Sequence, residues 1–300
     1  MIVSASYRTD IPAFYAEWFA RRRAAGFCEV ASPYGGRPYR VPLAGPDVDG
    51  FVFWTRNAAP FLPILENLAA EGLPFLVNYT VTGYPRALEA AVPPPERGLE
   101  LIRTLARRFG PRVAVWRYDP VLITGLTEAD WHRETFARLA GGLAGAVDEV
   151  VLSFAQIYAK TRANTRRAAE RHGFDWRDPP AEEKRALLAD LAALARDAGM
   201  TPRLCSQPEL LSPGLEPARC IDVDRLSNVA GRPVAAREKG NRPGCLCAES
   251  RDIGAYDSCP QGCVYCYAVR RPELAQARLR DHDPEGISLA PLPKTEPAVS

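Results

Sequence analysis

The stretch FVFWTRNAAPFLPILENLAAEGLPFLVNYTV, residues 51–81, contains two apolar runs with a helical pattern between them. The runs at 51–55 and 75–81 are rich in β-branched and aromatic residues, which is typical of buried strands. The residues at about 60–72 carry the spacing of a helix. A crossover of this length joins strands that pair in parallel. The stretch therefore predicts a parallel sheet covered by helices.

The same strand–helix unit recurs along the chain as far as about residue 215. Six such units predict an α/β fold, and specifically a partial or closed β/α barrel of the TIM type. A doubly wound sheet is the alternative, but its glycine-rich first turn is missing from SASYRTDIP (4–12). The other predicted strands are 2–6, 113–118, 149–154 and 201–206, and the other predicted helices are 12–26, 95–109, 127–143 (capped by Thr127) and 181–199.

The composition changes after residue 215. We therefore divide the chain into a barrel core at 1–215, a cysteine-rich segment at 216–283 and a weakly ordered, proline-rich tail at 284–300. The middle segment has few apolar runs and holds most of the eight cysteines. We expect it to bind a cluster and to pack on the mouth of the barrel.

Charge and hydropathy exclude several classes of protein. The 38 basic and 36 acidic residues nearly balance, so neither nucleic acid nor a membrane surface is expected as a partner. The first fifteen residues lack the pattern of a secretory signal, and no apolar run of about 18 residues predicts a membrane span. We therefore expect a cytoplasmic protein, in which cysteines more often bind metals than form disulfides.

Three cysteines lie close together in CPQGCVYC (259–266), namely Cys259, Cys263 and Cys266. Thiolates at this spacing share a compact loop, and both zinc and iron–sulfur clusters accept cysteine-only ligation. Zinc usually takes two separated pairs, which would leave Cys259 unexplained. A [4Fe–4S] cluster with three protein ligands uses the CxxxCxxC spacing directly and leaves one iron open.

Four further cysteines could form an auxiliary metal site. They are Cys205, Cys220, Cys245 and Cys247. Alternatively, Cys205 and Cys220 are small buried hydrophobic residues, as free cysteines often are.

The segment CPQGCVYC resembles the CxxxCx(aromatic)C signature of radical S-adenosylmethionine enzymes, with Tyr265 at the aromatic position. The longer run AYDSCPQGCVYCYA (255–268) is similar to the cluster loop of enzymes of the spore-photoproduct-lyase type. Most of the chain also resembles an uncharacterised family, domain of unknown function 1848. That resemblance rests on SASYRTDIPAFY (4–15), WRYDP (116–120) and CLCAESRDIGAYDSCPQGCVYCYA (245–268).

The resemblance implies a [4Fe–4S] cluster on the three cysteines and S-adenosylmethionine at its open iron. A reductase or flavodoxin-type donor would supply an electron, and cleavage would give a 5′-deoxyadenosyl radical that acts on an unknown, small-molecule substrate. The cysteine loop comes after six β/α units instead of the first, so the barrel would be circularly permuted. The glycine-glycine-glutamate segment that contacts the methionine amine in such enzymes is absent. The alternatives are a metal-binding (iron–sulfur or zinc) barrel without radical chemistry and a nucleic-acid repair or modification protein.

Polar side chains gather where the predicted strands end, which is where β/α barrels place their active sites. The arginines could grip a carboxylate or phosphate, and the aspartates could bind ribose hydroxyls or an amine. Alternatively, Arg8–Asp10 and Arg117–Asp119 are salt bridges that hold the rim. The candidate catalytic residues are Arg8, Asp10, Arg117 and Asp119, and those for binding S-adenosylmethionine or substrate are Thr55, Arg56, Tyr79, Thr80 and Ser153.

Overall fold

The strand–helix–strand unit at 51–81 forms as the sequence predicts. In the computed structural model, which describes residues 1–31 and 37–292, β4 (Gly50–Thr55) leads through η1 (Ala59–Phe61) and α3 (Leu62–Ala70) to β5 (Phe75–Thr80). The two strands pair in parallel, with Phe53 opposite Val77.

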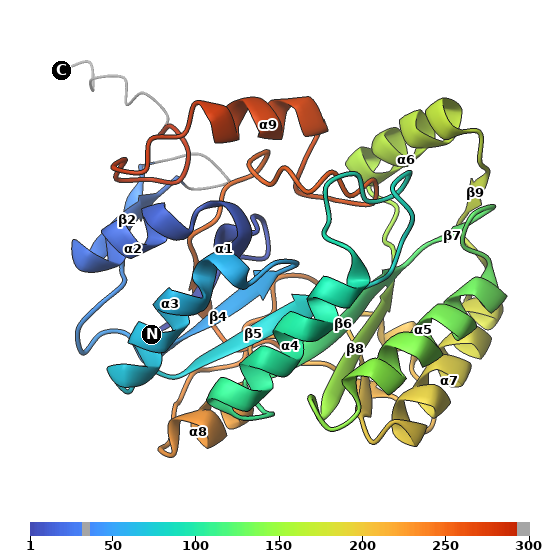
Figure 1. Cartoon of the computed structure of the whole chain (residues 1–300), viewed down its shortest axis with the longest axis horizontal. Coiled ribbons are helices and arrows are strands. Elements are labelled where there is room, and N and C mark those ends of the chain that lie inside the picture. Colours follow the sequence, from blue (N-terminus) through green and yellow to red (C-terminus); the bar gives the residue numbers. More distant parts are fainter. Residues whose placement is uncertain (32–36, 293–300) are drawn as a thin grey trace.

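These strands belong to a sheet of eight strands, all parallel, in the order β11-β10-β8-β6-β5-β4-β1-β12 (Figure 1). From β1 to β11 each new strand is added on the same side, so the reversal of a doubly wound sheet does not occur. Only β12 is added on the other side, beside β1. The remaining strands are β1 (Ile2–Ala5), β6 (Ala114–Val121), β8 (Glu149–Phe154), β10 (Thr201–Leu204), β11 (Glu216–Pro217) and β12 (Ser250–Asp252). Within the described residues, β11 and β12 are the edges of the sheet, and no pairing joins them.

Helices α3, α4 (Pro95–Phe109), α5 (Ala129–Leu143) and α7 (Ala181–Asp197) cover one face of the sheet (Figure 1). Alternate residues of each strand face them, because successive side chains of a strand point to opposite faces. Phe53, Val77 and Trp116 belong to this core. One predicted cap is wrong: α5 begins after Glu128, and the Thr127 hydroxyl donates to the carbonyl oxygen of Leu122 instead, at 2.9 Å.

The opposite face of the sheet is covered by residues 218–248, which include α8 (Val223–Ala230). Val52, Leu76 and Val115 from the strands pack there with residues such as Ile221. The backbone N–H of Ala248 donates to the carbonyl oxygen of Ile221 at 3.0 Å. The predicted cysteine-rich segment 216–283 thus supplies β11 and β12 to the sheet and covers the face opposite the helices, here called the inner face.

The ends of the chain also differ from the prediction. The helix expected at 12–26 is divided at Tyr15 into α1 (Ile11–Phe14) and α2 (Ala16–Ala24). Residues 284–292 of the expected weak tail pack on α2, where the Trp18 indole N–H donates to Gly286 O at 2.9 Å. Residues 293–300 of that tail lie outside the described part. The smaller elements include two antiparallel strand pairs, β2 (Phe27–Val30) with β3 (Tyr39–Pro42) and β7 (Ile123–Thr124) with β9 (Trp176–Arg177). They also include the helices α6 (Ala159–His172), η2 (Pro208–Leu210) and α9 (Pro272–Arg280).

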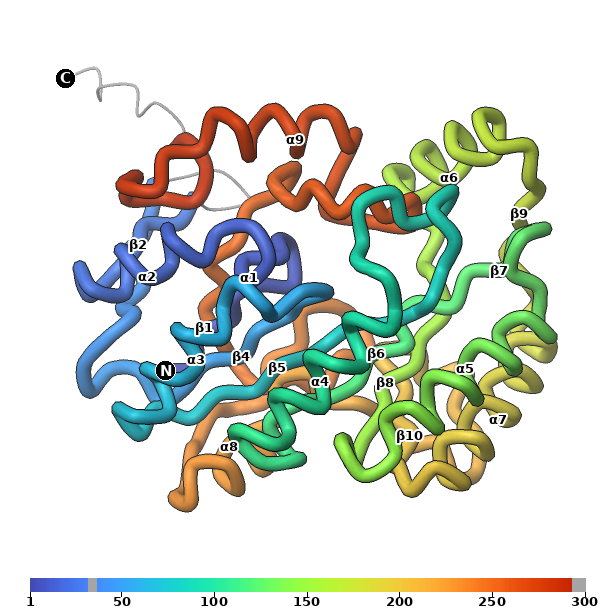
Figure 2. The backbone as a smooth tube through the Cα atoms, in the orientation of Figure 1, coloured from blue at the N-terminus to red at the C-terminus, as the bar shows by residue number. Residues whose placement is uncertain are grey.

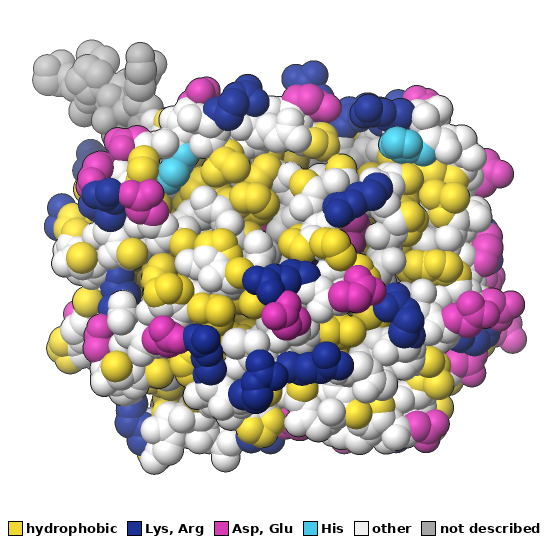
Figure 3. Space-filling view, in the orientation of Figure 1, with side chains coloured by type: hydrophobic (Ala, Val, Ile, Leu, Met, Phe, Trp, Pro, Cys, Tyr) yellow, Lys and Arg dark blue, Asp and Glu magenta, His cyan; other side chains and the backbone are white. Residues whose placement is uncertain are grey.

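On the face shown in Figure 3, basic and acidic side chains are interspersed with apolar ones. Of the helices in the described residues, none is both long and apolar enough to span a bilayer.

Gly254, directly after β12, is where the chain passes closest to the end of β1. A Cβ at this position would lie 1.9 Å from the Ser6 Oγ and 3.1 Å from the Thr9 Oγ1. We expect Gly254→Ala to lower the free energy of unfolding by about 1–3 kcal/mol, the usual cost of overpacking a tight site. Urea unfolding followed by circular dichroism measures it.

The matched control is Gly141→Ala, inside α5, where nothing lies within 4 Å of the added methyl group. Alanine favours a helix over glycine, so this change should raise the stability by up to about 1 kcal/mol. Equal stabilities of the two variants would contradict the close approach at Gly254.

Candidate functional site

The chain leaves β12 at Asp252 and turns across the C-terminal ends of β1 and β4. Residues 253–268, here called the cysteine loop, meet the residues that follow β1. The Thr9 and Ser258 hydroxyl oxygens are 2.6 Å apart, and the Tyr15 hydroxyl donates to Ser258 O at 2.7 Å. In Figure 2 this orange-red stretch runs along the edge of the sheet beneath α9.

Two other parts of the chain hold the cysteine loop from the far side. From the β5–α4 connection, Leu88 O accepts the backbone N–H of Val264 at 3.0 Å. From α6, the Thr161 hydroxyl donates to Tyr265 O at 3.2 Å, and the Asn164 amide donates to Val269 O at 2.9 Å. The loop is thus fixed by three segments that are far apart in the sequence.

The cysteine triad, Cys259, Cys263 and Cys266, is half-buried and reduced. Burial raises the pKa of Cys259, and the nearby charges of Asp10 and of the other two cysteines raise it further. Burial also raises the pKa of Cys263, to about 12, and that of Cys266. The three thiols are therefore neutral at neutral pH, and a bound metal must displace their protons.

Three cysteine thiolates at this spacing can ligate either an iron–sulfur cluster or zinc. Neither here nor elsewhere in the described residues do three His, Cys, Asp or Glu side chains already surround one point. In a cluster each thiolate binds its own iron, so the sulfur atoms need not meet at one point. In the same loop the Gln261 Oε1 is buried and has no hydrogen-bond partner among the described residues. An unpaired buried acceptor of this kind is unusual in a closed protein core.

Arg8 and Asp10, two predicted catalytic residues, lie beside the loop but do not pair with each other. Arg8 is paired with Asp252 through its Nε at 2.9 Å and its Nη2 at 2.8 Å. Asp10 caps α1 by accepting the backbone N–H of Ala13, and it also accepts the Gln261 amide at 2.8 Å. Burial raises the pKa of Asp10 despite these hydrogen bonds. Arg8 fastens the end of β12 and Asp10 fastens the cysteine loop, and the Arg8–Asp10 salt bridge named as an alternative is not formed.

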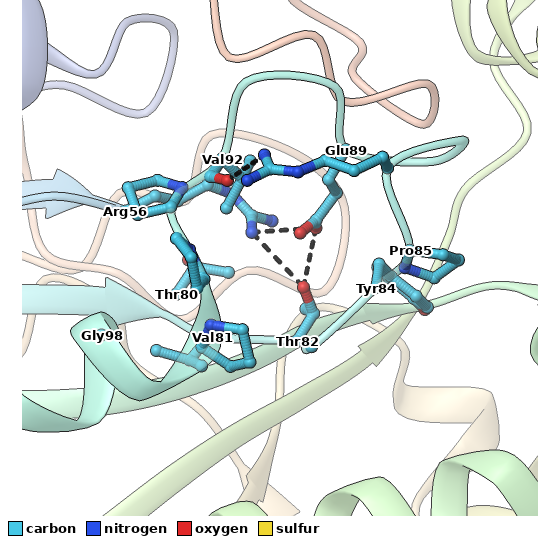
Figure 4. Close-up of a pocket in the computed structure, with 14 residues that line it drawn as sticks. Arg56, Thr80, Val81, Thr82, Tyr84, Pro85, Glu89, Val92 and Gly98 are labelled. Atoms are coloured by element: carbon cyan, nitrogen blue, oxygen red, sulfur yellow. Dashed lines mark hydrogen bonds and ion pairs between the residues drawn. The ribbon is translucent and has the colours of Figure 1, made fainter.

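Arg56 lies at the end of β4 in a buried polar network (Figure 4). Its Nη1 is 2.9 Å from Glu89 Oε1 and 3.3 Å from Thr82 Oγ1, and its Nη2 donates to the Tyr265 hydroxyl. Burial alone would lower the pKa of Arg56, but Glu89 and, to a lesser degree, Tyr265, Cys263 and Asp10 together outweigh it and raise the pKa. The network borders a cavity of about 270 Å³, which Thr80 also lines. This cavity is slightly smaller than most ligand pockets, which start at roughly 300 Å³.

The side chains of two predicted binding residues point toward the face of the sheet that the helices cover. Tyr79 belongs to the core beneath the helices, and its hydroxyl donates to Arg56 O at 3.1 Å. Thr55 has the same orientation as Phe53, two residues earlier, and its hydroxyl oxygen accepts the Asn57 N–H at 2.9 Å. Neither side chain is placed to contact a ligand on the inner face.

Arg117, Asp119 and Ser153 come together on the inner face, at the ends of β6 and β8. Asp119 accepts hydrogen bonds from both Arg117 and Ser153. Burial alone would raise the pKa of Asp119, but the charges of Arg117 and Arg242 and the Ser153 hydrogen bond together outweigh it and lower the pKa. The Arg117–Asp119 salt bridge named as an alternative is therefore present. The Arg117 Nη1 also donates to the Cys220 sulfur at 2.8 Å.

The four remaining candidate cysteines lie in a row beside the Arg117–Asp119 pair. Their order in the row is Cys205, Cys220, Cys247 and Cys245. The Sγ atoms of Cys205 and Cys220 are 3.8 Å apart. Cys220 and Cys247 lie close enough for each to shift the pKa of the other, as do Cys247 and Cys245. The hydrogen bond from Cys247 lowers the pKa of Cys245 to about 6. We call this group the four-cysteine row.

Residues 2–268 match the model of the family described as Domain of unknown function (DUF1848). The chain belongs to this family. Every candidate site residue lies within the part matched to DUF1848, including the triad and the four-cysteine row. No curated protein matches the chain.

Several residues of this DUF1848 site were missed by the sequence analysis. They are the partners of the predicted side chains, and all but Asn78, which lies in the predicted strand β5, are in short strands or loops with no periodic pattern. Asp252 ends a strand of three residues, and Glu89 and Arg242 lie in connections. The missed partners are Asp252, Glu89, Gln261, Asn78 and Arg242.

A second cavity, of about 430 Å³, lies at the opposite end of the sheet, where β8 and β10 begin. It is lined by charged residues that are already paired, such as Arg225 with Asp148. This end of a β/α fold generally serves stability and not catalysis.

Proposed function

We propose that this chain is an iron–sulfur enzyme of the radical S-adenosylmethionine type. The observation that carries the proposal is the place of the cysteine loop. The loop follows β12 and lies over the C-terminal ends of the neighbouring parallel strands. Active sites of β/α barrels form at these ends.

The order of the strands supports a circularly permuted barrel. Starting from β12, the neighbours in the sheet are β1, β4, β5, β6, β8, β10 and β11. Apart from its starting point, this is the order of the chain, as in a barrel whose last contact, between β11 and β12, is not formed by strand pairing. The cysteine loop then follows the first strand of that series, although it comes near the end of the sequence.

In this proposal Cys259, Cys263 and Cys266 hold a [4Fe–4S] cluster that, when bound, supplies the electron for cleaving S-adenosylmethionine to a 5′-deoxyadenosyl radical. The protein keeps the ligands in place through Thr9, Ser258 and the Asp10–Gln261 hydrogen bond. The buried Glu89 accepts from the Tyr265 hydroxyl, which fixes the stretch between Cys263 and Cys266. The unpaired Gln261 Oε1 is available to a donor group of a bound molecule.

The test begins with protein purified under anaerobic conditions. We expect about four irons and four sulfides per chain at the triad, a [4Fe–4S] signal in electron paramagnetic resonance after dithionite, and 5′-deoxyadenosine after S-adenosylmethionine is added. The triple variant C259A/C263A/C266A should lose this cluster and the product. Cys28→Ala, which removes a buried cysteine of β2 away from the loop, should keep both.

Two results would overturn parts of the proposal. A cluster that forms without any 5′-deoxyadenosine would leave a metal-binding protein without radical chemistry. Unchanged cluster content in the triple variant would remove the triad as the ligand set.

A further inference from the structure

We propose that the four-cysteine row is a second metal site, a mononuclear four-thiolate centre that takes a divalent ion of the zinc class. It is distinct from the triad, and the inference does not depend on radical chemistry. It rests on how the chain brings these four cysteines together, on the spacing of their sulfur atoms and on the cations beside them.

The four cysteines come from three segments that meet on the face of the sheet covered by residues 218–248, where the Cys220 carbonyl oxygen accepts the Asn78 amide at 3.0 Å. Cys205 directly follows β10, Cys220 follows β11, and Cys245 and Cys247 precede β12. No strand pairing joins β11 to β12 in the described residues, and the covering segment 218–248 is the part of the chain that connects them. A metal bound by all four thiolates would link both edges of the sheet through this segment.

The spacing of the sulfur atoms favours a single ion. Tetrahedral zinc with bonds of about 2.3 Å places its sulfur ligands about 3.8 Å apart. The Cys205 and Cys220 sulfur atoms are 3.8 Å apart, and Cys247 and then Cys245 follow Cys220 as neighbours close enough to shift one another's pKa. The described side chains form a row and do not yet surround one point. Rotation of Cys245, the member of the row that is not buried, would bring the fourth sulfur toward the others.

Two arginines donate hydrogen bonds to the sulfur atoms of this row. Arg117 reaches Cys220 at 2.8 Å, and Arg242 reaches Cys205 at 3.4 Å. Four thiolates and one divalent ion carry a net charge of −2, which the two guanidinium groups offset in part, since Arg117 is also paired with Asp119. Hydrogen bonds from the protein to ligating atoms commonly orient and tune a metal site. Neutral buried cysteines that only fill space would gain little from two arginines.

The experiment uses the full-length triple variant C259A/C263A/C266A, so that the triad contributes no metal. The protein is stripped with a chelator under reducing, anaerobic conditions and titrated with Co²⁺, whose visible absorption reports tetrahedral thiolate ligation. We expect one Co²⁺ per chain with strong sulfur-to-cobalt charge transfer, and its displacement by one equivalent of Zn²⁺. The melting temperature should rise with either metal, because a ligand that binds only the folded chain stabilises it.

Adding Cys220→Ser or Cys247→Ser to the triple variant should weaken Co²⁺ binding at least tenfold, whereas adding Cys28→Ala should leave it unchanged. The triple variant keeps all four cysteines of the row, so its Co²⁺ titration remains a valid test even if a serine variant fails to fold. Absence of the thiolate spectrum in the triple variant would overturn the site. So would a Cys205–Cys220 disulfide in the anaerobic protein, or iron with acid-labile sulfide at these cysteines. A failed S-adenosylmethionine assay leaves this result unaffected.

Discussion

Asp252→Ala is expected to lower the free energy of unfolding by about 3–5 kcal/mol, the usual cost of breaking a buried ion pair from one side. Asp252 pairs with Arg8, and the two side chains are only 5% and 6% exposed. The carboxylate also accepts the Ser6 hydroxyl at 2.9 Å and the backbone N–H groups of Tyr7 and Gly254. Removing it leaves the Arg8 charge buried and several donors unpaired. Chemical unfolding monitored by tryptophan fluorescence gives the value.

The same variant should also release the cysteine loop, because Asp252 joins β12 to the residues that follow β1. We expect faster hydrogen exchange in residues 253–268 and less iron after reconstitution. The control is Asp130→Ala, which breaks a pair with Arg133 on the surface, where the Asp130 side chain is 88% exposed. Exposed pairs contribute less than about 1 kcal/mol. Similar losses of stability in the two variants would show that the Asp252–Arg8 pair contributes no more than an exposed ion pair.

Arg56→Met should lower the free energy of unfolding by about 3–5 kcal/mol, because it leaves the Glu89 carboxylate buried and without its cation. Glu89 also accepts from the Tyr265 hydroxyl, so the disturbance passes directly to the cysteine loop. We expect lower stability together with reduced iron binding. Both are measured on the same preparation, by urea unfolding and by iron analysis.

The double variant Arg56→Met/Glu89→Gln tests whether the pair acts as a unit. Neutralising the partner removes the unpaired charge, so the double variant should recover part of the stability lost in Arg56→Met. The matched surface control is Arg97→Met, whose pair with Glu100 is largely exposed. If the stability losses of the two changes simply add in the double variant, Arg56 and Glu89 do not act as a pair.

The sequence by itself determined the parallel sheet. Apolar runs such as 75–81 and helical patterns such as 95–109 are local signals, because burial on one or both faces dictates the spacing of apolar residues. The observed β5 and α4 follow these signals almost to the residue. The triad was also visible, because its ligands lie within eight residues of one another. Its role as a cluster site stays a prediction.

Only the tertiary structure decided which polar groups are partners. Arg8 pairs with Asp252, 244 residues away, and not with the nearby Asp10. β12 has three residues, too few to show a periodic pattern, yet it carries the cysteine loop to the ends of the parallel strands. Cys205, Cys220 and Cys247 meet because the segments that follow β10 and β11 and the segment before β12 lie over the same face of the sheet. Contacts between distant segments depend on the order of the strands, and no local pattern of residues encodes that order.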